Sequence, residues 1–260
     1  MFANPRFSLV PKNRNSVGTA ERVKVLLLAA GLGTRLRPIT NSMPKCLVPV
    51  GGRPLLDYWF DLFMGAGLKY VRINTHHLSE RVREYIAGIN ASKPFVVSEA
   101  FEQQLLGSAG TIRANHSFAS DAEHVLIVYA DNLSNLDLKA LLAFHRSNGN
   151  SLTMALFHTQ RPTQCGIAKL SEEGRIVDFV EKPRQPVSNL ANAGVYVVTA
   201  DVYRQIADMN KSDLGFDVLP GFVGQMHGWI WPGYHRDIGT PEDLEEARHE
   251  ALQMFSPRVG

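Results

Sequence analysis

A glycine-rich segment at residues 28–40, LAAGLGTRLRPIT, combines two features that proteins use to bind phosphate groups. Gly31 and Gly33 allow the backbone to approach a ligand closely and to present its N–H groups to an anion. Four cations lie within 19 residues of one another: Arg35, Arg37, Lys45 and Arg53. A nucleoside triphosphate carries roughly four negative charges and needs cations beside its β and γ phosphates. The segment therefore indicates a triphosphate-binding loop.

The same segment differs from the glycine pattern of dinucleotide-binding proteins. The third glycine of that pattern is missing, and Arg35 stands two residues after Gly33. A dinucleotide pyrophosphate is bound by a helix N-terminus without an arginine at this place. A dinucleotide-dependent oxidoreductase is therefore disfavoured, and a plain glycine turn with solvated arginines is the structural alternative.

Two aspartates could hold a hard divalent cation. Asp131 ends a predicted buried strand, VLIVYAD, at the carboxyl edge where α/β sheets bind ligands. Asp237 follows 106 residues later, just before the last predicted helix. Carboxylate oxygens are the ligands that Mg²⁺ prefers, although a strand-end turn or a helix-capping charge would also explain an aspartate at these places. Thr240 and Asp243 already serve the start of that helix, which favours the metal interpretation of Asp237.

An alternation of strands and helices must position these groups. Strands are predicted at 23–30, 69–75, 94–98, 124–130 and 152–158, and weaker ones at 166–170, 175–180 and 193–198. Helices are predicted at 54–66, from about residue 79, and at the end of the chain, where Thr240 can cap and Pro241 occupies the first turn. This order predicts an α/β fold with a mixed, mainly parallel sheet flanked by helices, more antiparallel in its second half.

Composition excludes several classes of protein. The chain has 260 residues, of which 45% are hydrophobic and 20% charged, so it is not a disordered or fibrous protein. The net charge is +2, but residues 1–20 carry three basic residues and no acid, so the other 240 sum to −1. A near-neutral body argues against nucleic-acid binding, and no apolar run reaches the roughly 18 residues of a membrane span. Two cysteines favour a reducing cytoplasm over a disulfide framework.

Eight sequence blocks, in this order, resemble the sugar-1-phosphate nucleotidyltransferases, the NDP-sugar pyrophosphorylases. They are LAAGLGTRLRPIT, MPKCLVPVGGRPLL, LLGSAGTI, VYADN, CGIAKL, VEKP, NAGVYVV and RDIGTPEDL. The resemblance covers residues 23–255. It is strongest to the stand-alone mannose-1-phosphate and heptose-1-phosphate guanylyltransferases, and the glucose-1-phosphate uridylyl- and thymidylyltransferases are near neighbours.

The resemblance implies a Rossmann-like, GT-A-like domain over residues 21–260, preceded by an extension at 1–20. Its sugar-phosphate-binding part would span about 150–235, and no residues remain for the C-terminal β-helix of larger relatives. The implied reaction transfers a nucleotidyl group from an NTP to a sugar 1-phosphate with Mg²⁺ as cofactor. A homodimer or another homo-oligomer is compatible with this family, and neither nucleic acid nor a membrane is an expected partner.

The resemblance also assigns roles to individual residues. Asp131 and Asp237 would hold Mg²⁺, and Arg35 and Lys45 would stabilise the leaving pyrophosphate. The implied catalytic residues are Arg35, Lys45, Asp131 and Lys182. The implied nucleotide-binding residues are Leu28, Ala29, Ala30, Gly31, Gly33, Thr34, Arg35, Glu102 and Gly107. The implied sugar-phosphate-binding residues are Gly166, Glu181, Lys182 and Asn192.

The identity of the nucleotide base stays open at the level of sequence. Guanylyltransferase relatives often carry an acidic residue and a proline directly before Leu-Gly, whereas this chain has QQLL at residues 103–106. Glu102 can accept hydrogen bonds from a guanine edge, and Gln103 can read guanine or a pyrimidine. GTP with mannose 1-phosphate is therefore the main hypothesis, and UTP or dTTP with glucose 1-phosphate is the alternative. A non-catalytic regulatory homologue is disfavoured because the cations and carboxylates are all present.

Three other features have simpler interpretations. Adjacent histidines such as His76 and His77 point apart on an extended chain, which argues against a metal pair. Trp229 and Trp231 alternate in a predicted strand, where packing is the default. Cys46 is not needed as a nucleophile, because the expected reaction has no acyl or thioester step.

Overall fold

The computed structural model describes residues 23–147 and 149–255, in which a nine-stranded sheet is the central layer. Its main strands run in the order β10-β9-β11-β6-β1-β4-β5, and β8 pairs with β11 and β12. The bounds are β1 (Val23–Leu28), β4 (Tyr70–Thr75), β5 (Val96–Phe101), β6 (His124–Tyr129), β8 (Leu152–His158), β9 (Gly166–Leu170), β10 (Ile176–Glu181), β11 (Leu190–Thr199) and β12 (His227–Ile230). The β5-β4-β1-β6 part is parallel, and β11 pairs antiparallel with β6, β8 and β9.

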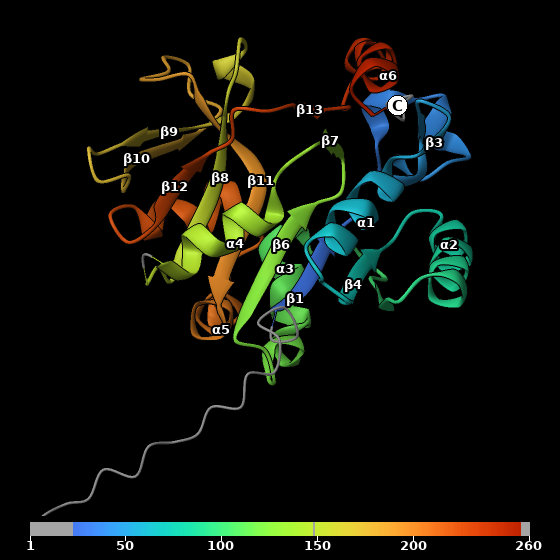
Figure 1. The fold of residues 1–260 in the computed structure, drawn as a ribbon, viewed down its shortest axis with the longest axis horizontal. Coiled ribbons are helices and arrows are strands. Elements are labelled where there is room, and N and C mark those ends of the chain that lie inside the picture. The colour runs from blue at the N-terminus through green and yellow to red at the C-terminus, as the bar shows by residue number, and fades with distance from the viewer. Residues whose placement is uncertain (1–22, 148, 256–260) are drawn as a thin grey trace, which may run out of the picture.

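Helices cover both faces of this sheet (Figure 1). One face packs against α1 (Leu55–Gly65), α2 (Ser79–Ser92) and α4 (Leu138–Ser147), and the other against α3 (Gly107–Ala114) and α5 (Ala200–Asp208). The residues of β1 alternate between the two cores: Val25 and Leu27 face the α1 side, and Leu26 and Leu28 face the α3 side. All four are at most 8% exposed, which explains why this strand is apolar at every one of these positions.

A third, smaller core lies under α6 (Pro241–Met254), at the carboxyl edge of the sheet. It joins α6 to α1, to the small ladder of β2 (Pro49–Val50) with β3 (Arg53–Pro54), and to β7 (Asn132–Ser134) with β13 (His235–Asp237). This core matters for the site because β7 directly follows Asp131 and β13 ends at Asp237. None of the helices among the described residues is long and apolar enough to cross a membrane.

The expected mixed α/β sheet flanked by helices is confirmed. The strands expected at 152–158 and 166–170 have those bounds, and β5 begins two residues later and ends three residues later than expected. Three helices were missed by the sequence reading: α3, α4 and α5. The first contains two glycines in the sequence GSAGTIRA, so its helix propensity is weak and its packing against α5 must hold it. The extension expected at residues 1–20 lies outside the described residues.

The start of α6 has the N-cap residue that the sequence predicts, Thr240. Thr240 Oγ1 accepts a hydrogen bond from the Asp243 backbone N–H at 3.1 Å, as an N-cap residue does. We expect Thr240→Ala to lower the free energy of unfolding by about 1 kcal/mol, measured by urea denaturation. Thr240→Ser, which keeps the hydroxyl, is the control and should lose much less. An alanine variant as stable as the wild type would contradict the role of this cap.

Candidate functional site

The glycine-rich loop after β1 continues as three short 3₁₀ turns, at Thr34–Leu36, Ile39–Asn41 and Lys45–Leu47. Gly33 has a φ of +61°, and a Cβ atom there would lie 2.8 Å from Thr40 Cγ2, so only glycine fits without a shift. The Thr40 hydroxyl in turn donates to the Gly33 carbonyl at 2.7 Å. The loop is thereby closed on itself, and it delivers the Lys45 side chain beneath the carboxyl edge of the sheet.

Lys45 connects the two aspartates that the sequence singles out. Its Nζ lies 2.9 Å from Asp131 Oδ2 and 3.0 Å from Asp237 Oδ1. The Lys45 side chain is 9% exposed, whereas the Asp131 and Asp237 side chains are 40% and 50% exposed and so remain open to a ligand. Arg35 Nη2 lies 3.9 Å from Asp237 Oδ2, and Gly239 makes this approach possible because a Cβ there would lie 2.6 Å from Arg35 Nη2.

The β7–β13 ladder explains how Asp131 and Asp237 come together. In this ladder Asp237 pairs with Asn132, the residue after Asp131. The Ile238 backbone N–H donates to the Asp131 carbonyl at 3.2 Å and extends the pairing by one step. The two carboxylates are thus held by backbone hydrogen bonds, so their proximity does not depend on side-chain rotamers alone.

The charges of this cluster shift one another's protonation. Burial alone would raise the pKa of Asp131, but the charge and hydrogen bond of Lys45 outweigh it and hold that pKa below its usual value. For Asp237, burial and the nearby Asp131 carboxylate outweigh Lys45, and the pKa is raised. Burial lowers and the two carboxylates raise the pKa of Lys45, and the carboxylates prevail. Two carboxylates therefore share one ammonium group.

A cavity of about 310 Å³ opens beside this cluster. Of the expected residues, it is lined by Leu28, Ala29, Ala30, Gly31, Lys45, Glu102, Gly107 and Asp131. Gly107 has a φ of +74°, and a Cβ there would overlap the Ser212 carbonyl, so this wall also requires glycine. The remaining nucleotide-binding candidates, Gly33, Thr34 and Arg35, belong to the loop and turn that follow and do not line the cavity.

Several lining residues were not expected from the sequence. They are Cys46, Asn74, Leu105, Ser108, Thr111, Tyr129, Ala130 and Asp213. A sequence signal existed for Asn74, which lies near the carboxyl end of β4, and for Ser108 and Thr111, which belong to the LLGSAGTI block. Asp213 gave none, because it precedes a π-helical turn at Leu214–Val218 that no periodicity indicates.

The sugar-phosphate candidates lie on β9, β10 and β11. Glu181 Oε2 lies so close to Gly166 that a Cβ there would overlap it, and burial raises the pKa of Glu181. Lys182 is exposed, with a φ of +51°, and its backbone N–H donates to the Cys165 carbonyl at 3.0 Å. Asn192 Nδ2 donates to the Tyr196 hydroxyl at 2.7 Å across an irregular part of β11.

A glycine links this group to the cavity. A Cβ on Gly215 would lie 2.8 Å from Glu181 Oε2 and 3.3 Å from Oδ1 of Asp213, which lines the cavity. Of the candidate sugar-phosphate residues, Glu181 therefore lies near Asp213, at the border of the cavity.

The Asp131 and Asp237 carboxylates fit a hard divalent cation. Both are acceptor-only oxygen ligands, and both already contact one positive group, the Lys45 ammonium. Among the described residues no three His, Cys, Asp or Glu side chains form a group that could hold a metal. A cation here would need further ligands from water or from phosphate oxygens, which is the usual mode for Mg²⁺.

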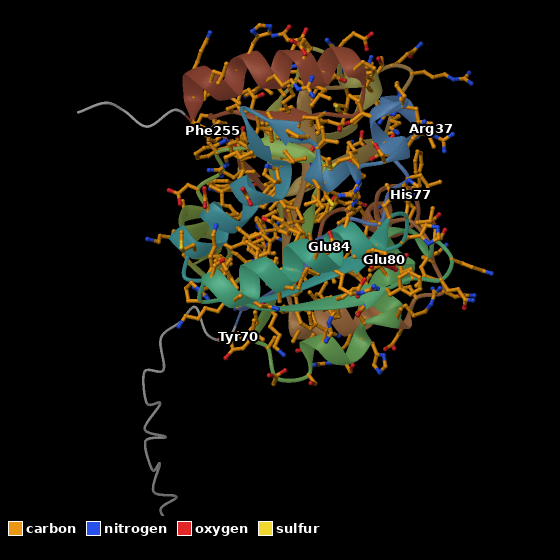
Figure 2. The ribbon with its side chains drawn as sticks, turned by 90° about the vertical axis from the view of Figure 1, so that its right-hand side faces the viewer. Arg37, Tyr70, His77, Glu80, Glu84 and Phe255 are labelled. Atoms are coloured by element: carbon orange, nitrogen blue, oxygen red, sulfur yellow. The ribbon has the colours of Figure 1, made fainter. Side chains whose placement is uncertain are left out.

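The histidine pair, the two tryptophans and Cys46, for which the sequence favoured structural roles, have surroundings that fit such roles. His76 Nδ1 lies 2.8 Å from the Glu102 carbonyl and His77 Nε2 lies 3.0 Å from the Thr40 carbonyl, so both ring nitrogens donate hydrogen bonds. Figure 2 shows His77 near Arg37 and far from Tyr70, at the end to which β4 runs. The Trp229 and Trp231 rings stack with centroids 5.6 Å apart. Burial raises the pKa of the Cys46 thiol to about 12, which leaves it a poor nucleophile.

The model of the Nucleotidyl transferase family matches residues 24–254 of the chain. The chain belongs to this family. Members generally use a divalent metal ion. The chain is 31% identical over 240 residues to a mannose-1-phosphate guanylyltransferase of Mycobacterium tuberculosis, covering 91% of this chain and 66% of that protein. It is 30% identical over 233 residues to a mannose-1-phosphate guanylyltransferase catalytic subunit beta of Drosophila pseudoobscura pseudoobscura, covering 88% and 62%.

The chain therefore spans slightly less than two thirds of the length of these relatives. Among solved structures, it is similar to a Bacillus anthracis protein provisionally assigned as a glucose-1-phosphate thymidylyltransferase. The TM-score is 0.81, with 21% identity over 91% of this chain and 98% of that one. This similarity confirms the expected fold.

The shared ammonium group predicts a pH-dependent stability. In Lys45→Met the two carboxylates lose their counter-ion, and we expect the free energy of unfolding at pH 7 to fall by about 1 kcal/mol, because both are partly exposed. The loss should shrink towards pH 4, because the Asp237 carboxyl, whose pKa is raised, takes up a proton as the pH falls and the repulsion between the two carboxylates is removed. Asp131, whose pKa is lowered, stays ionised and paired with Lys45 over this range in the wild type.

Urea denaturation at the two pH values measures this difference, and Lys45→Arg, which keeps the charge, is the control. A loss of equal size at pH 7 and pH 4 would mean that Lys45 acts through packing alone.

Proposed function

We propose that the protein transfers a guanylyl group from GTP to mannose 1-phosphate or a related heptose 1-phosphate, giving a GDP-sugar and pyrophosphate. The observation that carries this proposal is the cluster of Lys45, Asp131 and Asp237 beside a cavity with two glycine-lined walls. A polyanionic substrate needs this combination of a cation, carboxylates for a metal, and close backbone approach. The relatives at about 30% identity carry the names of mannose-1-phosphate guanylyltransferases.

In this reaction an oxygen of the sugar phosphate attacks the α-phosphorus of the NTP. The bond from the α-phosphorus to the bridging oxygen breaks, and its electron pair leaves with pyrophosphate. The chain's contribution is to position the two substrates and to stabilise charge on the leaving group. We assign this role to Lys45 and Arg35, because both contact the carboxylate cluster and both belong to the segment that follows the glycine-rich loop.

We propose Mg²⁺ as the metal, held by Asp131 and Asp237. When bound, Mg²⁺ would neutralise phosphate charge and polarise the α-phosphate. The chain's residues set up this role in two ways: the β7–β13 ladder holds the two carboxylates, and Lys45 contacts both and holds the pKa of Asp131 below its usual value. The proposed nucleotide residues are Leu28, Ala29, Ala30, Gly31, Gly33, Thr34, Arg35, Glu102 and Gly107.

The acceptor would bind at β9–β11. Lys182 is exposed beside Glu181 and is proposed to clamp the sugar phosphate, and Glu181 accepts hydrogen bonds from sugar hydroxyls. Burial raises the pKa of the Glu181 carboxyl, yet Lys182 opposes this shift. Asn192 and the backbone of Gly166 complete the proposed set. The region about 150–235 would thus be the sugar-phosphate-binding part of a single domain over residues 21–260.

UTP or dTTP with glucose 1-phosphate is the second candidate. It is favoured by the assignment of the Bacillus anthracis protein and by the QQLL sequence at residues 103–106.

A cytoplasmic location accords with Cys46 and Cys165, which are both free thiols. A homo-oligomer remains a prediction from the resemblance.

The deciding experiment is a matrix of nucleoside triphosphates against sugar 1-phosphates, with Mg²⁺ and pyrophosphate release as the readout. We expect the highest kcat/KM for GTP with mannose 1-phosphate or a heptose 1-phosphate. A preference for UTP or dTTP with glucose 1-phosphate would establish the alternative. No turnover in any combination would overturn the proposed activity.

The metal assignment predicts the effect of neutralising the carboxylates. Asp131→Asn and Asp237→Asn should each lower kcat by about 10²-fold or more, because charge stabilisation at the α-phosphate is lost. Asp137→Asn is a matched control, since Asp137 caps α4 through the Ala140 N–H and lies outside the cavity. Near-normal turnover in both site variants, with far-ultraviolet circular dichroism unchanged, would remove the assignment.

A further inference from the structure

Asn74 occupies a central place in the wall of the cavity. It lies near the carboxyl end of β4, in register with Leu28 on β1, and it is only 4% exposed. A buried amide side chain must find partners for its oxygen and for both N–H groups, or its burial is costly. At Asn74 those partners all belong to the cavity wall.

The three hydrogen bonds of Asn74 fix the orientation of its amide. Its Oδ1 accepts from the Ala29 backbone N–H at 2.6 Å, which only an oxygen can do. Its Nδ2 then donates to Glu102 Oε1 at 2.9 Å and to Thr111 Oγ1 at 3.0 Å. Asn74 therefore ties the first residue of the phosphate-binding loop to the segment after β5 and to α3.

Glu102 is held from several sides as well. It is 5% exposed, and besides Asn74 its Oε1 accepts from the Thr111 hydroxyl at 2.5 Å. Its Oε2 accepts from the Leu106 backbone N–H at 3.1 Å. Both carboxylate oxygens thus have donors from the protein itself. Such a carboxylate is better placed to hold the wall than to read a base.

We propose that Asn74 is a positioning residue of the nucleotide pocket and that Glu102 is its structural partner, not the group that distinguishes one base from another. Asn74 sets the distance between the Ala29 backbone and α3, and so the width of the cavity in which the nucleotide binds. This inference rests on the proposed binding of a nucleoside triphosphate in that cavity. According to this proposal, Asn74 and Glu102 together determine how tightly any nucleotide binds, and Glu102 does not select the base.

An exchange of the two groups tests the proposal. In Asn74→Asp a second carboxylate faces Glu102. In Glu102→Gln an amide N–H group replaces one of the two carboxylate oxygens, which accept hydrogen bonds from Asn74, Thr111 and Leu106. In the double variant Asn74→Asp/Glu102→Gln, the carboxylate introduced on β4 can accept from the Ala29 N–H and from the introduced glutamine amide. The glutamine oxygen can accept from the Leu106 N–H. The double variant has the net charge of the wild type. The number of hydrogen bonds across the wall is also restored, but residue 102 now donates to residue 74.

Calorimetric titration of each protein with GTP and with UTP, in the presence of Mg²⁺, gives the readout. We expect Asn74→Asp to raise Kd for whichever nucleotide the wild type binds by at least about tenfold, and Glu102→Gln to raise it less. The double variant should return to within about threefold of the wild type. The ratio of the two nucleotide affinities should stay unchanged throughout, because no base contact is altered.

Two results would overturn the proposal. One is a double variant that binds no better than the weaker single variant. The other is a change in the GTP-to-UTP affinity ratio whenever residue 102 is glutamine, which would show that Glu102 reads the base. A wild type that binds neither nucleotide would instead count against the proposed function and would leave no pocket for this pair to position.

Thr75→Val is the matched control. Thr75 is the next residue of β4, is equally buried, and donates to Glu99 on β5 at 2.6 Å, but it does not line the cavity. Its removal should lower the thermal midpoint without changing Kd. If Thr75→Val raised Kd as much as Asn74→Asp, the effect of Asn74 would be one of general stability and the positioning role would be wrong.

Discussion

The contact of Lys45 with Asp131 and Asp237 is the interaction on which the architecture of the site depends. Two carboxylates at this distance from one ammonium group would repel each other without it. The three residues come from separate parts of the chain, with the aspartates 86 and 192 positions from Lys45, so they meet only when the sheet and the small third core have both formed. This arrangement of charges therefore exists only in the folded chain.

The rest of the fold supplies rigidity at the carboxyl edge of the sheet. β1 is buried on both faces and is followed by the glycine-rich loop, while β6 ends two residues before Asp131. The β7–β13 ladder and α6 then close the edge from the other side. Each side chain of the cluster therefore belongs to a strand end or a short turn whose backbone is fixed by hydrogen bonds. This limits the motion of the three side chains relative to one another.

A second constraint is the need to satisfy polar groups that the cavity wall buries. Asn74, Glu102 and Thr111 are almost inaccessible, and each uses its hydrogen-bonding capacity on the others or on nearby backbone. A network of this kind in a low-dielectric wall admits few alternative arrangements. The hydrogen bonds that these buried groups must form therefore also fix the shape of the cavity.

The sequence by itself determined the strands of the main sheet, the capped start of α6 and the types of the candidate site residues, because local periodicity and capping chemistry encode them. It did not predict the short β7–β13 ladder that brings Asp131 and Asp237 together. It also determined the family, through blocks that keep their order. Helices α4 and α5 also have a local signal, an apolar face at helical spacing and, for α5, the cap at Thr199, although the prediction did not include them. The pairing of Asn74 with Glu102, the place of Asp213 and helix α3 were decided by tertiary structure. For these the stabilising partner is distant in sequence or, in α3, the local helix signal is weak, and no local pattern records such a contact.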